Sequence, residues 1–525
     1  MIPYFYFFTL HSSFFILHKG EARIREARII AAKLQKKYEK AAEKRLYFNN
    51  LYYFCSMIHK KTRKRATFAL VMLLLVGLLV WVYSRWDVWF HNPEEPPYIS
   101  ETAPHRVLLT FGDSLEMSRN VSWQADSILH PSHLELALLP DGDTVSIEAY
   151  GEVFRSRSGQ AAYYVARLRQ LQPEACYAYR AVTNGKTSPW YHFHTYAQGR
   201  DSLSFLYVGD VQDSIGGEAN RFLREALSRH PQSEFLVCGG DLTERPVDAH
   251  WAETFRDIDS VCQAMPLLNV TGNHDYLKGL PVSLERRFPL VFSYFLDSKV
   301  EDNQVYTLRY GSAQFFLLDS NRELPYLLTQ RRWLEEQLSR STAPWKIVIL
   351  HHPLFSIRGN NNLIQRWVFN DLIEDYGVDL VLQGHEHAYA RMTSSASSPT
   401  KRTTPVYTVS HCSPKNYFIQ FDDRFDKFGI SSRYYQTVSI KADTLTMAAY
   451  EVYHHTLYDS LRIIKNVRSD GFSPSEDAAP RVLIEDYGRD IPEYLEFTPD
   501  LSRKKDRAYA ERIKEYKSRH PERLR

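Results

Sequence analysis

The chain has 525 residues, which exceeds one ordinary domain and leaves room for about two or three. Its composition, 44% hydrophobic and 24% charged, is typical of a folded globular protein. The formal net charge of +3 is uneven, because residues 1–65 hold fifteen Lys and Arg against four Asp and Glu, while the rest holds 50 basic and 58 acidic residues. Phosphate-backbone binding draws on clustered basic charge, so this acidic body argues against a nucleic-acid partner.

An uncharged apolar run covers residues 66–83. As a helix it would extend about 27 Å, close to the roughly 30 Å hydrocarbon core of a bilayer. Basic residues precede the run and Glu94 and Glu95 follow it, so the positive-inside rule predicts a cytoplasmic N-terminus and a periplasmic or extracellular body. No small-x-small cleavage signal follows the run, which favours an uncleaved membrane anchor over a cleaved signal.

Residues 1–65 form the predicted cytoplasmic segment, which joins an aromatic-rich start to a basic stretch. One hypothesis is that translation begins at Met57, which would place a compact basic region directly before the apolar run, as in export signals. The alternative is a short cytoplasmic helix over residues 21–46.

Residues 96–198 contain short runs that alternate between apolar and polar positions, the pattern of β-strands. The predicted strands are 106–110, 117–123, 134–139, 144–150, 162–168, 176–183 and 190–195. Seven strands in about a hundred residues indicate a β-sandwich. Within it, Leu171-Gln172-Pro173 followed by Tyr177 resembles the tyrosine corner of fibronectin type III domains. We expect this domain to be a spacer or a wall of the functional site.

Residues 201–466 alternate between strand and helix patterns, which predicts a layered α/β domain. The predicted strands include 205–208, 235–238, 267–270, 305–309, 314–318, 347–350, 380–382 and 406–409, and the predicted helices lie near 218–228, 249–263, 328–340 and 363–376. Residues 467–525 are polar and charged, and we expect a C-terminal extension that ends in a basic helix at about 502–518.

Polar side chains follow five of these strands. They are Gly209-Asp210, Gly240-Asp241, Gly272-Asn273-His274-Asp275, His351-His352-Pro353 and Gly384-His385-Glu386-His387. In open α/β sheets, ligands bind outside the carboxyl ends of the strands. One such aspartate is usually a helix cap or turn former, but the whole set supplies oxygen and nitrogen donors suited to two first-row divalent ions. Two cations about 3.5–4 Å apart neutralise a phosphate ester and hold a bridging hydroxide, so the set predicts a phosphoesterase.

This ordered set, behind a fibronectin-like domain, resembles the purple acid phosphatase-like branch of the calcineurin-type metallophosphoesterases over about residues 100–466. The resemblance implies that Asp210 and His387 bind the first metal and that Asp241 bridges both metals. It implies further that the second metal is bound by Asn273, His351 and His385. His274 would then lie over the substrate phosphate, while Asp275 would brace the loop.

Two positions depart from that family. Its purple members have a tyrosine three residues after the bridging aspartate, where this chain has Glu244. Relatives without the tyrosine usually have a histidine two residues after the first aspartate, where this chain has Gln212. Either Gln212 or Glu244 is a candidate oxygen donor to the first metal. We expect Mn, Zn or ferrous iron rather than a ferric ion, held more weakly at the first site than at the second.

The loop 356–362 lies where such enzymes add substrate contacts, and Arg358 is a candidate for substrate binding, because its planar donors suit a phosphate oxygen. A solvated loop arginine is the alternative interpretation.

The sequence therefore predicts a layered α/β metallophosphoesterase sandwich, preceded by an all-β fibronectin type III-like sandwich and one transmembrane helix. The predicted function is the hydrolysis of phosphomonoesters by a metal-bridging hydroxide, with two divalent metal ions as cofactors and the membrane as a partner of the N-terminal helix. One alternative is a phosphodiesterase or pyrophosphohydrolase on the same scaffold. The other is a catalytically weak surface protein that binds phosphorylated ligands. No oligomeric state is predicted.

Overall fold

The computed structural model describes residues 60–112, 116–294, 305–359, 361–393, 405–465 and 482–524. The proposed start at Met57 and the possible helix over 21–46 lie outside these residues. The chain divides into two compact units, Met1–Val88 and Trp89–Arg525.

Helix α2 (Lys60–Phe90) contains the predicted apolar run and extends beyond it at both ends. Its segment Phe68–Asp87 has a mean hydropathy of 2.1 and is not buried against other parts of the protein. Length and composition therefore suit a membrane span, although a signal sequence would have the same properties.

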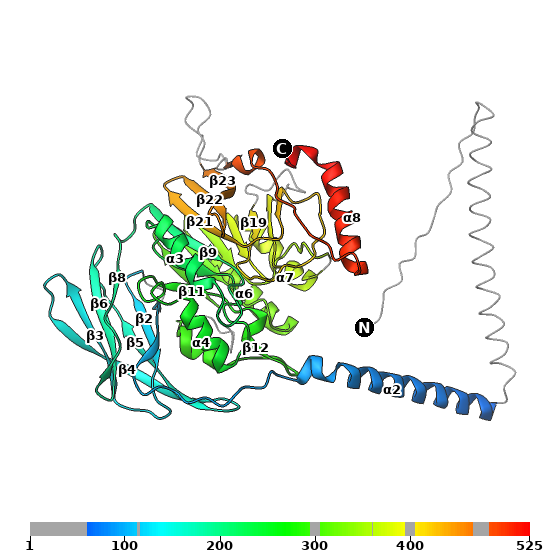
Figure 1. The fold of residues 1–525 in the computed structure, drawn as a ribbon, viewed down its shortest axis with the longest axis horizontal. Coiled ribbons are helices and arrows are strands. Elements are labelled where there is room, and N and C mark those ends of the chain that lie inside the picture. The colour runs from blue at the N-terminus through cyan, green and yellow to red at the C-terminus, as the bar shows by residue number, and fades with distance from the viewer. Residues whose placement is uncertain are drawn as a thin grey trace. The chain divides into compact units, whose positions relative to one another are not determined.

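The first domain of the second unit is built entirely from strands (Figure 1). They are β1 (His105–Phe111), β2 (Arg119–Gln124), β3 (Ser132–Leu139), β4 (Thr144–Arg155), β5 (Gln160–Leu168), β6 (Cys176–Thr183), β7 (Lys186–Thr187) and β8 (Tyr191–His194). All seven predicted strands are present. Trp123 is buried in the core and donates to Thr183 Oγ1 over 2.9 Å. The hydroxyl of Tyr177 accepts a hydrogen bond of 2.8 Å from the backbone N–H of Gln172, as predicted for a corner of this kind.

Two mixed sheets form the centre of the second domain. The first contains β24 (Val482–Asp486), β23 (Leu457–Lys465), β22 (Thr444–Glu451), β21 (Tyr434–Lys441), β9 (Ser202–Val208), β10 (Leu236–Cys238) and β11 (Leu267–Asn269), in that order. The second contains β14 (Tyr306–Tyr310), β15 (Ala313–Leu317), β16 (Trp345–Ile349), β17 (Leu380–Gln383), β19 (Val406–Val409), β18 (Tyr389–Thr393) and β20 (Lys427–Gly429). Strands β9, β10 and β11 are mutually parallel, and so are β15, β16, β17 and β19.

The two sheets pack face to face through buried aromatic rings. The ring centroids of Phe205 in β9 and Phe235, directly before β10, lie 5.0 Å apart. Each of them also contacts Phe315 of the second sheet, at 5.5 and 5.6 Å. Since side chains alternate along a strand, Leu206 and Leu236 point to the opposite face of their sheet. Helices cover that face.

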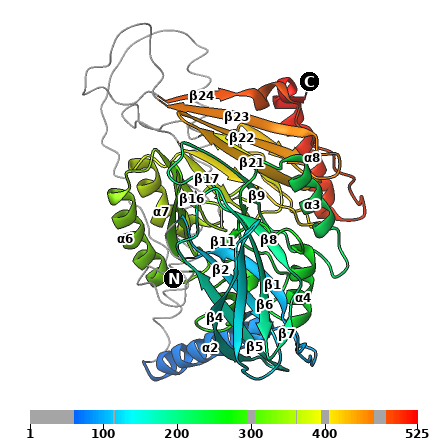
Figure 2. The ribbon, with the colours of Figure 1, turned by 90° about the vertical axis from the view of Figure 1, so that its left-hand side faces the viewer.

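The outer layers are helical on both sides (Figure 2). Buried side chains of α3 (Ala219–Arg229) and α4 (Asp248–Asp257) join the core of the first sheet. Those of α6 (Leu324–Arg340), α7 (Leu363–Asp375) and α8 (Lys504–Arg519) join the core on the second. The predicted layered α/β domain is confirmed. The predicted helix over 249–263 is wrong beyond Asp257, because Ser260 has a φ of 61°, which does not continue a right-handed helix.

The β-sandwich is attached directly to the α/β domain. Strand β1 pairs in parallel with β11 through Thr110 and Leu267. Nearby, the side-chain Nε2 of Gln263 donates to the backbone carbonyl of Val107 over 3.0 Å. The backbone carbonyl of Gln263 accepts a 2.7 Å hydrogen bond from the Tyr179 hydroxyl. The sandwich therefore supports the strand that leads into the Gly272–Asp275 turn.

A buried ion pair fixes the segment that enters the second unit. Glu95 pairs with Arg287 at the start of α5 (Arg287–Phe292), and both side chains are fully buried. Glu95 also accepts a 2.9 Å bond from the Asp248 N–H. The Arg287 guanidinium lies 4.9 Å from the ring of Phe154 in the sandwich. One charge pair thus joins the entering segment, the sandwich and the α/β domain.

Replacing Arg287 with Met should destabilise the protein by about 3–5 kcal/mol, because Glu95 would be left as an unpaired buried charge. Chemical denaturation of the full chain in detergent measures the change. The matched control is the next residue, since Arg286→Met breaks an exposed pair with Glu152 and should cost less than about 1 kcal/mol. Equal effects of the two substitutions would contradict this role for Glu95 and Arg287.

The carboxyl group of Asp257, at the end of α4, is almost fully buried beside Glu253. Burial and the Glu253 charge raise its pKa from 3.8 to about 7, although Arg256 lies 3.1 Å away. The folded state therefore holds this proton more tightly than the unfolded chain does. A group of this kind lowers stability increasingly as the pH rises from 3.8 to about 7.

Asp257→Asn should remove this penalty and raise the free energy of unfolding at pH 8 by roughly 1–3 kcal/mol relative to the parent. At pH 4 the gain should disappear, because the parent carboxyl is then protonated in the folded state. Denaturation of both proteins at the two pH values tests the prediction, and a gain independent of pH would refute it.

Candidate metal centre

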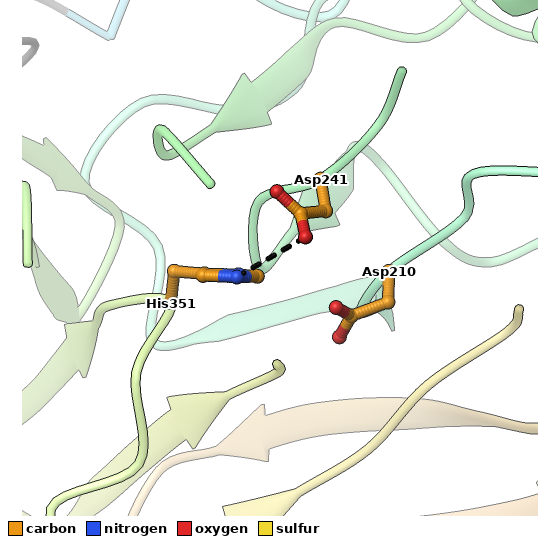
Figure 3. A group of neighbouring side chains, drawn as sticks. All are labelled: Asp210, Asp241 and His351. Atoms are coloured by element: carbon orange, nitrogen blue, oxygen red, sulfur yellow. Dashed lines mark ion pairs between the residues drawn. The ribbon is translucent and has the colours of Figure 1, made fainter. Parts of the chain in front are cut away.

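The polar residues predicted at the strand ends meet at one edge of the two sheets. Asp210 follows β9, Asp241 follows β10, Asn273 lies in η1 (Asn273–Asp275) after β11, His351 follows β16, and His385 and His387 follow β17. Figure 3 shows Asp210, Asp241 and His351 turned toward one another. One donor atom from each of these three buried residues lies within 4.8 Å of the others, close enough to hold a metal ion.

One group of donor atoms surrounds the Nε2 of His351. This nitrogen lies 3.1 Å from Asn273 Oδ1 and 3.2 Å from His385 Nδ1. It also lies 3.3 Å from Asp241 Oδ2. Ligands of a first-row ion each lie about 2.0–2.2 Å from the metal, so neighbouring ligands are about 3 Å apart. These spacings are those of atoms that share one cation.

A second group surrounds the Nε2 of His387, which lies 3.4 Å from Asp210 Oδ1 and 3.1 Å from the side-chain amide of Gln212. The other oxygen of Asp210 accepts a 2.6 Å bond from the His385 backbone N–H. Asp210 Oδ1 and Gln212 Oε1 are buried and receive no hydrogen bond. Buried acceptors without partners are costly, so this group also suits a cation.

Backbone carbonyls hold two of the imidazole rings in one tautomer. His351 Nδ1 lies 2.9 Å from the carbonyl of Gly239, and His387 Nδ1 lies 3.1 Å from that of Lys415. A carbonyl only accepts, so each Nδ1 carries the proton that it donates. With the proton on Nδ1, the Nε2 of each ring is the atom that faces its donor group, which is the arrangement of a metal-ligating histidine.

The charge of Asp241 dominates the electrostatics of the site. Burial disfavours a charge on either partner, yet Asp241 raises the pKa of His351 to about 9. Conversely, His351 and His274 hold the pKa of Asp241 below its usual range against the effect of burial. Burial and neighbouring histidines lower the pKa of His385, which keeps its ring neutral and available as a ligand. The group therefore favours positive charge next to Asp241.

The loops that carry the candidate ligands have unusual backbone conformations. Asp210, Asp241, His385 and His387 have φ angles of 47°, 52°, 72° and 43°, in the left-handed region. Non-glycine residues rarely adopt it, and such conformations cluster at functional sites. Gly272 is needed for close approach, since a Cβ there would lie 2.0 Å from Asp241 Oδ1. The site is thus built by tight turns around the two carboxylates.

His274 lies on the open side of the site. Its backbone N–H donates to Asp241 Oδ1 over 2.8 Å, and its ring Nδ1 donates to the Glu244 carbonyl. The ring Nε2 lies 3.8 Å from Asp241 Oδ2, and the side chain is 26% exposed. Asp275 is buried below and accepts a 2.8 Å bond from the Gly272 N–H, which suits a loop brace.

Arg358 lies at the exposed rim of the site, and its connection to the site is a contact with the ring of Tyr417. Its guanidinium is 4.4 Å from the centroid of Tyr417, which stacks on His387 at 4.2 Å with an interplanar angle of 18°. Glu386 ties this loop to the ligand turn, because it accepts bonds of 2.5 Å from Ser356 Oγ and 2.6 Å from the Ile357 N–H. The role of Arg358 in substrate binding stays a prediction.

Two further residues contribute to the site without belonging to a sequence motif. Tyr417 covers His387, and the Lys415 carbonyl orients that same ring. Both belong to the segment after β19, which carries no motif and reaches the site only through the fold. Glu244, one of the two candidate oxygen donors, ion-pairs with the Lys415 ammonium instead.

The donor set fits two divalent cations. It offers two buried carboxylates, an amide oxygen and imidazoles whose free nitrogens converge, which are the donors that Mn, Zn and ferrous iron accept. This agrees with the dinuclear centre expected as the cofactor.

Comparisons with known proteins agree with this geometry. The calcineurin-like phosphoesterase family matches residues 203–389, and the N-terminal domain of purple acid phosphatases matches residues 104–195. An uncharacterized protein of Mycobacterium tuberculosis is 24% identical over 58% of this chain and 65% of its own length. Purple acid phosphatase 18 of Arabidopsis thaliana is 24% identical over 59% of this chain and 70% of its own length. The chain thus spans just under two thirds of the mycobacterial relative.

The structural comparison supports the same fold. A solved structure of PhoD is 13% identical, with a TM-score of 0.51, and the match covers 81% of this chain and 99% of that one. At this identity the likeness concerns the fold alone. The two family matches themselves give the chain a calcineurin-like metallophosphoesterase domain within residues 203–389, preceded by a purple acid phosphatase N-terminal domain within residues 104–195.

Proposed function

We propose that the protein hydrolyses phosphomonoesters at the site between the two sheets. The observation that carries this proposal is the convergence of carboxylate, amide and imidazole donors in two adjoining groups around His351 and His387. Acid phosphatase relatives support a monoester as the substrate class. The fold by itself does not determine the substrate.

The proposed ligand roles follow the two donor groups. Asp210 and His387 would hold the first ion, Asn273, His351 and His385 the second, and Asp241 both. Two bound divalent cations would neutralise the phosphate charge and bring the pKa of a bound water near neutrality.

His274 would act directly on the substrate. Its Nδ1 is committed to the Glu244 carbonyl, so Nε2 is the atom that faces the open side beside Asp241. A protonated Nε2 there would donate to a phosphate oxygen and pass its proton to the leaving oxygen. Arg358 would contact the phosphate from the rim, held against the ring of Tyr417.

The remaining parts of the chain have proposed roles as well. Residues 66–83 within α2 would anchor the protein, with residues 1–65 in the cytoplasm and the catalytic body outside it. Residues 96–198 would be a fibronectin type III-like support for the catalytic domain of residues 201–466. Residues 467–525 would be a charged extension, part of which packs on the body through Tyr509, Ile513 and Tyr516 of α8.

Two alternatives remain distinct from this proposal. A phosphodiesterase or pyrophosphohydrolase would use the same donors on a different substrate, a phosphate with a second ester group in one case and a phosphoanhydride in the other. A catalytically weak surface protein would bind phosphorylated ligands without turnover, and the departures at Gln212 and Glu244 are the observations that favour it.

Asp241→Ala should remove both ions, because Asp241 is the proposed shared ligand. It should also lower monoester turnover at least about 100-fold, since mutating residues that only support metal ligands already costs about 10- to 100-fold. Metal content is measured by elemental analysis of the full chain, and turnover is compared for a nitrophenyl phosphate monoester and its diester. Two ions retained in the variant would refute the ligand role. Faster diester turnover in the parent would favour the diesterase, and metal binding without turnover would favour the binding protein.

His274→Ala should lower kcat by about 100- to 10,000-fold while the metal content stays that of the parent, because the ring is proposed to transfer a proton rather than to bind an ion. The matched control is His352→Ala, a partly buried neighbour that hydrogen-bonds Ser320 and has no proposed contact with substrate. An unchanged kcat in the His274 variant would contradict the assignment.

A further inference from the structure

The two residues that depart from the family pattern occupy different environments. Gln212 is 2% exposed and lies inside the donor group around His387, which is the proposed first metal site, with its side-chain amide 3.1 Å from His387 Nε2. Its backbone N–H donates to the Asp241 carbonyl over 3.1 Å, which fixes it between the two carboxylate loops. Glu244 lies outside that group, where the ammonium of Lys415 neutralises its carboxylate.

The side-chain amide of Gln212 has one atom without a hydrogen-bond partner. Its Oε1 is buried and accepts no hydrogen bond, and the same is true of Asp210 Oδ1. Rotating the amide by half a turn exchanges Nε2 and Oε1 and leaves its outline unchanged, since the two atoms are nearly the same size. The oxygen then takes the position next to His387 Nε2.

Lys415 contacts the surroundings of both candidate oxygen donors, Gln212 and Glu244, in different ways. Its carbonyl accepts from His387 Nδ1 over 3.1 Å, which directs the Nε2 lone pair toward Gln212 and Asp210. Its ammonium pairs with Glu244 at the partly exposed rim. A single residue after β19 therefore orients one ligand and holds the competing carboxylate away.

From this geometry we infer that the Gln212 side-chain oxygen is the fourth protein ligand of the first metal site, and that Glu244 is excluded from it. The inference rests on the proposed metallophosphoesterase function and specifies its first site. The ligands are then two carboxylates, one imidazole and one neutral amide oxygen.

This donor set predicts which cation the first site takes. Three oxygens and one nitrogen suit a hard divalent ion of the manganese class, whereas zinc favours sites richer in nitrogen or sulfur. A phenolate or an additional imidazole would bind more strongly than a neutral amide. The first site should therefore exchange its ion more readily than the second.

The test is Mn²⁺ binding to the full chain, followed by elemental analysis and by the paramagnetic resonance signal of coupled Mn²⁺ pairs. The parent should bind two ions and show the coupled signal. Gln212→Leu should keep one ion, lose the coupled signal and bind the other at least about tenfold more weakly. Gln212→Glu, which restores an oxygen at the same reach, should restore the pair.

Glu244→Gln is the matched control, because it keeps the carbonyl that orients His274 and removes only the carboxylate. It should bind two ions with the parent affinity. Gln212→His supplies an imidazole and should shift the first site from Mn²⁺ toward Zn²⁺ in competition. Thermal denaturation and the retained second ion confirm that each variant is folded.

Two results would overturn the inference. The first is two tightly bound ions in Gln212→Leu together with an unchanged metal preference in Gln212→His. The second is the loss of one ion in Glu244→Gln. These outcomes concern metal binding alone. A parent that binds two ions and hydrolyses no phosphate ester would refute the proposed function and leave the ligand assignment intact.

Discussion

Two buried carboxylates set the constraint on which this structure depends. Asp210 and Asp241 are 0% and 1% exposed, and their partners in the fold are backbone N–H groups and histidines. Removing a carboxylate from water is costly unless positive charge compensates it. The convergence of imidazole nitrogens on the same space, with Asp210 Oδ1 unsatisfied, makes a cation the natural partner. The turns, the glycines and the histidine tautomers all serve that arrangement.

Long-range packing brings the candidate ligands together. The first sheet supplies Asp210, Asp241 and Asn273, and the second supplies three histidines, so the site exists only because the two sheets pack with their parallel strands ending at the same edge. The aromatic contacts of Phe205 and Phe235 with Phe315 hold that packing. Behind it, β1 of the sandwich pairs with β11 and so stiffens the approach to the Gly272–Asp275 turn. The sandwich is thus a structural support of the site.

The segment after β19 makes several contacts around His387. Lys415 orients His387 through its carbonyl and binds Glu244 through its ammonium, while Tyr417 stacks on His387 and carries Arg358. These contacts surround His387 next to Gln212 and Glu244, the two positions at which the sequence departs from the family that it resembles. They also join Arg358 at the rim to His387, a candidate metal ligand.

The sequence by itself determined the element order and the chemistry of the strand ends. Alternation of period two predicted the sandwich strands, and apolar runs ending in Asp, Asn and His predicted the candidate site, because both signals are local. Strands β18, β20, β21 and β24 were not predicted; β20 and β24 are short strands at the edges of their sheets, and β21 pairs with β9, which lies more than 200 residues earlier in the chain. Only the tertiary structure separated Gln212 from Glu244, because the contact that decides between them comes from Lys415, more than 150 residues later.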